Sequence, residues 1–185
     1  MQVETDEGLE PVAERLEGPG LGGLQGERIP VDVDALGVAA LVALGAVVLL
    51  LDALKGALAV VLALWLVPEA PRLHAAVGLA AFLGHVYPVW LKLHGGKGVA
   101  TALGVLVVLV PLGALAGALV YAGLVAAWRV SSVGSLAGGV TAVAIASLTA
   151  RAPEYAWLSA LLFALIVWTH RSNIQRLLRH TERRF

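Results

Sequence analysis

The chain reads Gly84-His85-Val86-Tyr87-Pro88-Val89-Trp90-Leu91-Lys92-Leu93-His94-Gly95-Gly96-Lys97-Gly98-Val99-Ala100-Thr101 between two long apolar runs. Gly95, Gly96 and Gly98 have no Cβ, so a ligand can approach the backbone closely and successive N–H groups can point into one concavity. Lys97 adds a positive charge to this turn. The apolar run that follows predicts a helix whose free N-terminal N–H groups face the same spot. These features predict a phosphate site, although the spacing is not that of a Walker A loop.

The same residues carry a resemblance to a known family. Gly84-His85-x-Tyr87-Pro88 followed by Gly95-Gly96-Lys97-Gly98-Val99-Ala100-Thr101 resembles a signature of the bacterial acyl-phosphate:glycerol-3-phosphate acyltransferases. Members of this family are small integral-membrane enzymes that transfer the first acyl chain to glycerol 3-phosphate. The resemblance implies binding of glycerol 3-phosphate, acyl phosphate and membrane lipids, no cofactor, and contact with the enzyme that supplies acyl phosphate. The alternative is a glycine-rich turn between two membrane helices, anchored at the surface by Lys97.

Composition indicates a membrane protein. Of the 185 residues, 59% are hydrophobic and only 14% are charged, and the mean hydropathy is +0.85. A soluble domain is about half apolar and about a quarter charged. The lack of cysteine excludes disulfides and cysteine-based metal sites and nucleophiles. A net charge of zero predicts no general attraction to nucleic acid, and the histidine spacings predict no structural metal.

The apolar runs predict an all-α polytopic membrane helix bundle with about six spans. The spans are predicted over residues 45–67 (with an approach segment from 36), 73–91, 99–110, 114–128, 136–150 and 155–168. Residues 1–35 are acidic and contain Pro and Gly, so a polar N-terminal segment is expected to precede a membrane domain over 36–185. Asp52 and Lys55 share one face of the first span. They are either a structural pair that orients the helix or a functional pair.

Six crossings place both termini on one side of the membrane, together with the turn at 92–98, the polar segment at 129–135 and the tail after 169. That side carries Arg15, Arg28, Lys92, Lys97, Arg129 and five tail arginines, whereas the other carries Arg72 and Arg151. The positive-inside rule makes the first side cytoplasmic. We therefore expect a bacterial inner-membrane protein with a single cytoplasm-facing site.

The tail contains a second match. His170-Arg171-Ser172-Asn173-Ile174-Gln175-Arg176-Leu177-Leu178 resembles the family's C-terminal signature His-Arg-x-x-Asn-Ile-x-Arg-Leu. Arg171 and Arg176 suit bidentate phosphate contacts, and Asn173 suits donation to a phosphate or a hydroxyl. The alternative is that the tail arginines are attracted to anionic lipid headgroups. We favour this alternative for Arg179, Arg183 and Arg184.

A third, weaker resemblance concerns Arg129-x-x-Ser132-x-x-Ser135, which is similar to a family segment Arg-Tyr-x-Ser-x-x-Ser. Both hydroxyls lie on one helical face and suit donation to a phosphate or a polarised carbonyl. For Ser132 we favour an N-cap instead, whereas for Ser135 the resemblance favours substrate contact.

The candidate catalytic residues are His85, Lys97, Ser135 and His170. An imidazole titrates near pH 6.5 and can serve as an acid or a base; for His85 a hydrogen bond between helices is the favoured alternative. His74 and His94 are expected at the membrane surface. No Ser-His-Asp arrangement is evident, so the base is one of the two candidate histidines or the substrate's own phosphate.

The resemblance covers residues 45–185 and departs from the family before them. The family has a further N-terminal spanning helix and then a Gly-Ser-Gly-Asn-x-Gly-Ala-Thr-Asn loop. Here Gly18, Gly20 and Gly23 keep the glycine spacing, while Pro19, Leu21, Leu24 and Gln25 stand near the polar positions. We expect weaker activity than in a relative with the complete loop. This departure has three possible origins: a divergent paralogue, an altered reading frame or a truncated start. The alternative functions are an impaired relative that acts as a scaffold or regulator and, less favoured, a phosphate-ester transporter.

Overall fold

The computed structural model describes residues 37–182, which are all-α. The helices are α2 (Val38–Leu66), α3 (Pro71–Val86), α4 (Val99–Leu109), α5 (Pro111–Trp128), α6 (Ser131–Thr149), α7 (Pro153–Thr169) and α8 (Arg171–Leu178), with a short 3-10 helix, η2 (Val89–Leu91). The chain divides into two compact units, Met1–Leu41 and Val42–Phe185, and among the described residues the second contains every helix except the first turn of α2. The predictions for residues 1–35, including the glycine-spaced loop at 18–23, lie outside the described residues.

Proline begins three of the helices: Pro71 starts α3, Pro111 starts α5 and Pro153 starts α7. Proline is favoured at the first helical position because its missing N–H would have no helical partner and its φ is already suitable. The prediction of a break over 111–113 was therefore wrong. The chain leaves the helical conformation only at Val110, where φ is −140°.

The helix α3 ends earlier than the predicted limit at residue 91. It stops at Val86, and a separate 3-10 helix follows. Pro88 explains this difference, because proline has no N–H to donate and disfavours the helical conformation of the residue before it. Tyr87 accordingly has φ −124° and ψ 58°. Lys92 and Leu93 then adopt positive φ angles and reverse the chain direction.

The segment 129–135 is mostly helical, contrary to the polar interruption that we predicted. Arg129 has a left-handed φ of 58° and Val130 is extended, and these two residues alone connect α5 to α6. Helix α6 begins at Ser131, and Val130 is its N-cap residue. Ser132 and Ser135 therefore project from the first turns of a helix rather than from a loop.

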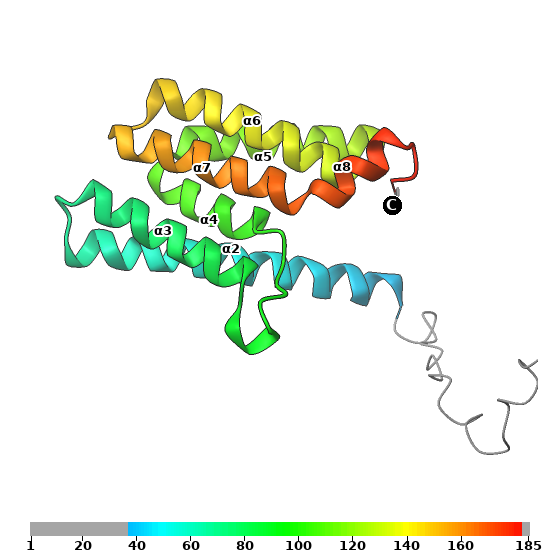
Figure 1. Ribbon diagram of the computed structural model, residues 1–185, viewed down its shortest axis with the longest axis horizontal. Helices are drawn as coiled ribbons and strands as arrows, with labels where there is room; N and C mark the ends of the chain where they lie inside the picture. The colour runs from blue at the N-terminus through cyan, green and yellow to red at the C-terminus, as the bar shows by residue number, and fades with distance from the viewer. Residues whose placement is uncertain (1–36, 183–185) are drawn as a thin grey trace, which may run out of the picture. The chain divides into compact units, whose positions relative to one another are not determined.

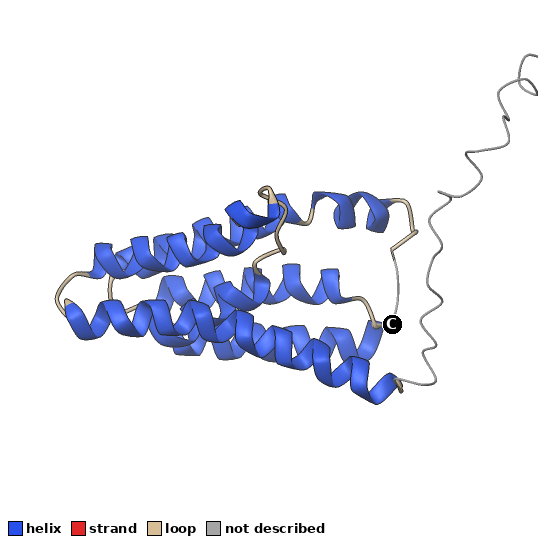
Figure 2. Cartoon of the chain, turned by 90° about the horizontal axis from the view of Figure 1, so that it is seen from below, coloured by secondary structure: helices blue, strands red, loops and turns tan. Residues whose placement is uncertain are grey.

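Within the second unit the helices lie in three layers (Figure 1). Helices α2 and α3 form one outer layer, α5 and α6 form the other, and α4 and α7 lie between them. Figure 2 shows the same arrangement after a turn of 90°, with short loops joining the helices. Helix α4 contacts α3 and α5, and helix α7 contacts α3 and α6. Side chains from every layer can therefore reach the interior.

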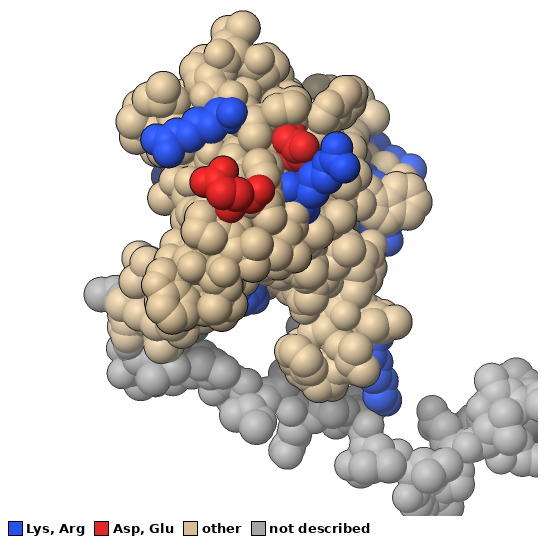
Figure 3. All heavy atoms as spheres, turned by 90° about the vertical axis from the view of Figure 1, so that its left-hand side faces the viewer, with Lys and Arg blue, Asp and Glu red and all other residues tan. Residues whose placement is uncertain are grey.

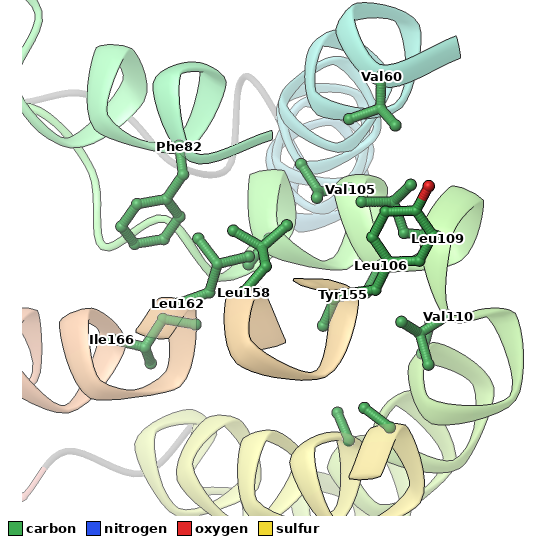
Figure 4. Packing of buried hydrophobic residues seen from close by; sticks show 14 of the residues in the cluster. Val60, Phe82, Val105, Leu106, Leu109, Val110, Tyr155, Leu158, Leu162 and Ile166 are labelled. Atoms are coloured by element: carbon green, nitrogen blue, oxygen red, sulfur yellow. The ribbon is translucent and has the colours of Figure 1, made fainter. Parts of the chain in front are cut away.

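The core of the bundle lies around the middle layer. Phe82 on α3, Val105 on α4 and Leu162 on α7 are almost fully buried. Figure 4 shows Leu158 and Leu162 on α7 directed toward Phe82. Lipid tails are as apolar as these side chains, so burying the side chains does not remove them from water. Such a core therefore stabilises a membrane protein mainly through close van der Waals packing.

Small residues allow the backbones to come close. A Cβ added to Gly56 of α2 would collide with the carbonyl oxygen of Thr101 on α4, and one added to Gly104 of α4 would collide with the backbone of α2. A Cβ on Gly117 of α5 would lie 2.6 Å from the carbonyl oxygen of Gly138 on α6. Helices α2 and α4, and likewise α5 and α6, therefore pack closely because glycine lies at their contacts.

The outer surface is apolar. Helices α2, α5 and α6 are long and apolar enough to cross a membrane, as is Pro71–Leu91, which comprises α3 and η2, whereas α4 and α7 are shorter apolar helices. Exposed tryptophans lie near both ends of the bundle, namely Trp65 and Trp157 near one and Trp90, Trp128 and Trp168 near the other. Tryptophan is enriched at membrane–water interfaces. The two levels therefore fit a bundle that spans a bilayer.

One end of the bundle carries the connections from α2 to α3 and from α6 to α7. Figure 3 shows this end with basic and acidic side chains next to each other on an otherwise uncharged surface. Arg72 Nε lies 3.5 Å from a Glu154 carboxylate oxygen. The positive charge is thus partly balanced at this end.

Candidate active site

A cavity of about 900 Å³ is lined by residues from each of the helices α2 to α8. Its size is within the range of small-molecule sites. Its polar lining consists of Asp52, His85, Lys97, Tyr121, Ser131, Ser132, Ser135, His170, Asn173, Arg176 and Glu182. Leu106, Ala114 and Ala142 belong to its apolar lining. The cavity therefore combines polar groups with a hydrophobic wall deeper along α4, α5 and α6.

Most of the predicted site residues meet at this cavity although they come from three distant segments. The lining includes His85, Gly96, Lys97, Gly98, Ser132, Ser135, His170, Asn173 and Arg176. Gly95 and Arg171 are not part of it. Arg171 instead lies over the ring of Trp168, 5.1 Å from its centroid, and donates to the Trp168 carbonyl.

The glycine turn is closed by its own backbone hydrogen bonds. The Gly95 N–H donates to the carbonyl of Val86 at 3.1 Å, and the Gly96 N–H donates to that of His85 at 3.3 Å. These two N–H groups are therefore already engaged with the end of α3. Gly98 has a φ of 82°, and a Cβ there would collide with the Phe82 ring, so the turn requires glycine at this position. The groups at the turn that remain suited to an anion are Lys97 and the N–H groups at the start of α4.

Lys97 lines the cavity and is separated from α4 only by Gly98. Its carbonyl accepts a hydrogen bond from the Thr169 hydroxyl at 3.0 Å, which ties the turn to the end of α7. Partial removal of water lowers the pKa of Lys97; nearby Glu182 opposes this change, and Arg176 adds to it. The ammonium thus belongs to a cluster of alternating charges at one end of the cavity.

Glu182 organises the C-terminal part of the site. Its carboxylate accepts hydrogen bonds from the Ser132 hydroxyl at 2.8 Å, the Asn173 amide at 2.6 Å and Arg176 Nε at 2.7 Å. Burial alone would raise the pKa of Glu182, but these three hydrogen bonds and the charge of Arg176 outweigh it and lower the pKa from 4.5 to about 2. The carboxylate therefore remains ionised and links α6 to α8.

Sequence reasoning missed Glu182. The available signal was that Glu182 is the only acidic residue after Glu154, in a tail that contains five arginines. The interpretation of Ser132 as an N-cap was wrong, because its hydroxyl donates to Glu182 and α6 has no side-chain cap. Ser135 donates to the carbonyl of Ser131 at 3.0 Å, which leaves its oxygen free to accept.

His170 is buried at the junction of α7 and α8. Its Nδ1 lies 2.8 Å from the carbonyl oxygen of Ile166. A carbonyl only accepts, so Nδ1 carries the proton and Nε2 has the lone pair. Burial lowers the pKa of His170; the Ile166 hydrogen bond raises it, Lys97 lowers it further and Glu182 raises it. The net reduction favours a neutral ring near pH 7, which is the form that a general base requires.

The predicted pair on α2 extends to a third residue. Asp52 and Lys55 form an ion pair of 2.6 Å. Lys55 Nζ also lies 2.6 Å from Nδ1 of His85. His85 is therefore hydrogen-bonded between helices, as the favoured interpretation predicted.

One further sequence-based expectation, for His74, was wrong. His74, which we expected at the membrane surface, is fully buried. Its two ring nitrogens lie 2.8 Å from the Tyr155 hydroxyl and from the Val67 carbonyl, so it joins α3 to α7 and to the end of α2.

Asn173 Oδ1 is buried and has no hydrogen-bond partner among the described residues. It is an unused acceptor on a cavity-lining side chain.

Comparison with known proteins agrees with this geometry. A sequence model of the family described as "Glycerol-3-phosphate acyltransferase" matches residues 36–180. The chain is 74% identical over 142 residues to a glycerol-3-phosphate acyltransferase of Myxococcus xanthus (strain DK1622), covering 77% of this chain and 74% of the relative. It is 48% identical over 146 residues to one of Anaeromyxobacter sp. (strain Fw109-5), covering 76% and 71%.

Two crystal structures of PlsY, an integral membrane glycerol 3-phosphate acyltransferase, have similar folds. The form with lysophosphatidic acid has a TM-score of 0.75 and 33% identity, covering 83% of this chain and 78% of that one. The form with glycerol 3-phosphate has a TM-score of 0.74 and 35% identity, covering 83% and 74%.

Proposed function

The chain belongs to the glycerol-3-phosphate acyltransferase family, and from this premise we propose that its cavity transfers an acyl group from acyl phosphate to the 1-hydroxyl of glycerol 3-phosphate. The protein is a membrane enzyme of phospholipid synthesis. In the proposed reaction the hydroxyl oxygen bonds to the acyl carbonyl carbon, and the bond from that carbon to the phosphate oxygen breaks. The hydroxyl proton passes to a base. The products are lysophosphatidate and inorganic phosphate.

The observation that carries this proposal is the composition of the 900 Å³ cavity. Lys97, His170 and Arg176 line its polar part, and apolar side chains such as Leu106 and Ala142 line its continuation into the bundle. An acyl phosphate has an anionic head, which the polar part of the cavity suits, and a hydrocarbon chain, which the apolar part suits. Glycerol 3-phosphate is a second anion and would share the basic end.

Charge stabilisation is the main catalytic effect that these residues can supply. Lys97 and the start of α4 offer positive charge and N–H donors to a phosphate, and Arg176 has further N–H groups besides the Nε that binds Glu182. The unpartnered Oδ1 of Asn173 is suited to accept a hydrogen bond from a substrate hydroxyl. Ser135 contributes an acceptor oxygen. Arg171 remains a predicted phosphate ligand that lies outside the cavity lining.

The base is proposed to be His170 or the phosphate of the substrate. The hydrogen bond to Ile166 places a proton on Nδ1, and in the neutral ring, which burial favours, Nε2 carries the lone pair. A phosphate monoester has a second pKa of about 6 and can also take a proton near neutrality. Both routes leave Lys97 and Arg176 to balance the charge of the departing phosphate.

The proposed topology has six spans, α2 to α7, in the bacterial inner membrane. Both termini and the polar part of the cavity would face the cytoplasm. The basic residues near that end, Lys92, Lys97, Arg129 and Arg176, support this orientation through the positive-inside rule. The acyl phosphate would then reach the site from the cytoplasmic leaflet, where contact with the enzyme that supplies it is also predicted.

Acyl transfer by the purified protein tests the proposal directly. Glycerol 3-phosphate is incubated with a long-chain acyl phosphate or, in parallel, with the matching acyl-CoA. We expect lysophosphatidate with acyl phosphate and none with acyl-CoA. Product from acyl-CoA alone would contradict the proposed donor, and no product from either donor would favour an impaired relative.

A further inference from the structure

A charged cluster joins α2 to α3 beside the cavity. Lys55 Nζ lies 2.6 Å from the Asp52 carboxylate and 2.6 Å from Nδ1 of His85, whereas Nδ1 and the carboxylate are 3.3 Å apart. Asp52 and His85 line the cavity. Acyl transfer as proposed needs no chemical step from either residue of α2, so the position of these costly charges in an apolar helix calls for another role.

Lys55 determines where the His85 ring carries its proton. An ammonium group donates hydrogen bonds and accepts none. The same ammonium forms the 2.6 Å ion pair with Asp52. Nδ1 of His85 must therefore accept from Lys55, which leaves the proton of the neutral ring on Nε2. In a doubly protonated ring, the Nδ1–H group would point at the ammonium of Lys55 at the same short distance. Repulsion between the two positive charges disfavours the doubly protonated ring.

The Nε2 edge of the ring meets the glycine turn. A Cβ added to Gly96 would collide with Nε2, so Gly96 lies against the ring only because it has no side chain. The Gly96 N–H also donates to the His85 carbonyl. Lys97 follows directly, and all three residues line the cavity. The Nε2–H group is thus a donor at the edge of the turn that is proposed to bind phosphate.

We propose that His85 is a neutral N–H donor to substrate phosphate and not the general base, and that Asp52 and Lys55 are positioning residues that hold it in the Nε2–H form. The inference rests on the proposed acyl transfer. The lone pair of the His85 ring is occupied by Lys55, so none is left to take the proton of the 1-hydroxyl. The base is then His170 or the substrate phosphate.

Two substitutions of His85 separate a donor from a base. Glutamine can place an amide N–H near the position of Nε2, asparagine is too short to do so, and neither amide is a base. A donor role predicts that His85→Gln retains kcat/KM within about tenfold of wild type, while His85→Asn loses about 10²–10³-fold, as for loss of one charge-stabilising donor. Equal losses in the two variants would overturn the proposal.

Nitrogen-15 NMR of labelled histidines in the detergent-solubilised wild-type protein gives a readout that does not depend on turnover. The His85 signal, identified by its loss in His85→Gln, is expected to show Nε2–H and a bare Nδ1. A proton on Nδ1, with or without one on Nε2, would overturn the proposal. If wild type fails to use acyl phosphate, the proposed function fails, and the NMR signal still decides the form of His85.

A matched pair of lysine variants tests the positioning role. Lys55→Met should move the proton to Nδ1, where Asp52 becomes the acceptor, and should lower kcat/KM. Lys92→Met removes a charge from an exposed residue outside the cavity lining, and should change neither property. An unchanged His85 signal in Lys55→Met would show that Lys55 does not set the protonation of the ring.

Discussion

Lys97 is the residue whose side chain most directly tests phosphate binding. A charge-assisted hydrogen bond contributes about 1.5–3 kcal/mol, so Lys97→Ala should lower kcat/KM for glycerol 3-phosphate by roughly 10- to 150-fold while insertion is unchanged. Lys97→Arg should rescue poorly, because a planar guanidinium does not replace a compact ammonium in a turn packed against Phe82. Steady-state kinetics of the purified variants, with Lys92→Ala as control, measure this effect. Wild-type activity in Lys97→Ala would reduce Lys97 to a surface anchor.

Glu182 is the residue that couples stability to pH. Its pKa in the folded protein is about 2, below the ordinary value of 4.5, so its contribution is fully present above about pH 4.5 and is lost as the pH falls toward 2. Glu182→Gln should lower Tm by ~4–8 °C at pH 7, for a loss of about 2 kcal/mol. The difference should shrink in melts at decreasing pH. Glu69→Gln, in an exposed loop, is the control; a constant difference across this range would contradict the link to ionisation.

At the scale of the helix, α5 contains a matched pair of glycines. Gly117 lies against the backbone of α6, whereas a Cβ on Gly123 would have no heavy atom within 4 Å. Gly117→Ala should destabilise the protein because the helices must separate, but Gly123→Ala should stabilise it slightly, by up to about 1 kcal/mol of helix propensity. Thermal unfolding of the two variants in one detergent measures both. Equal shifts would mean that close contact between α5 and α6 does not limit stability.

The sequence predicts the places of the spanning helices better than it predicts where they end. The approximate places of α2 to α7 follow from the long apolar runs, but α8 was not predicted, because Arg171–Leu178 is polar and too short for a span. Their ends were less certain because they depend on local geometry: Pro88 stops α3, whereas the left-handed Arg129 permits a turn of only two residues. Gly95 and Lys97 were recognised from local chemistry. Their different roles depend on which N–H groups the end of α3 occupies, and a linear pattern does not contain this information.

At the scale of the whole molecule, the candidate site depends on contacts between segments far apart in sequence. Glu182 joins Ser132 to Asn173, and Lys55 joins α2 to His85. The family signatures contain Ser132, Asn173 and His85, but they contain neither Glu182 nor Lys55, which hold these side chains. The convergence of the polar segments was predicted from the count of crossings alone, and the cavity lining agrees with it.

The orientation of the bundle is the last prediction. The chain has no native cysteine, so single cysteines introduced at exposed loop positions report sidedness without a background. His94 lies in the loop before the glycine turn, and Glu69 lies between α2 and α3, at the opposite end of the bundle. Basic residues are concentrated at the His94 end, whereas Arg72 is paired with Glu154 at the other, so the positive-inside rule places His94 in the cytoplasm. A membrane-impermeant maleimide should label Glu69→Cys in spheroplasts, and His94→Cys only after lysis. Labelling of both before lysis, or of His94→Cys alone, would contradict a cytoplasmic site.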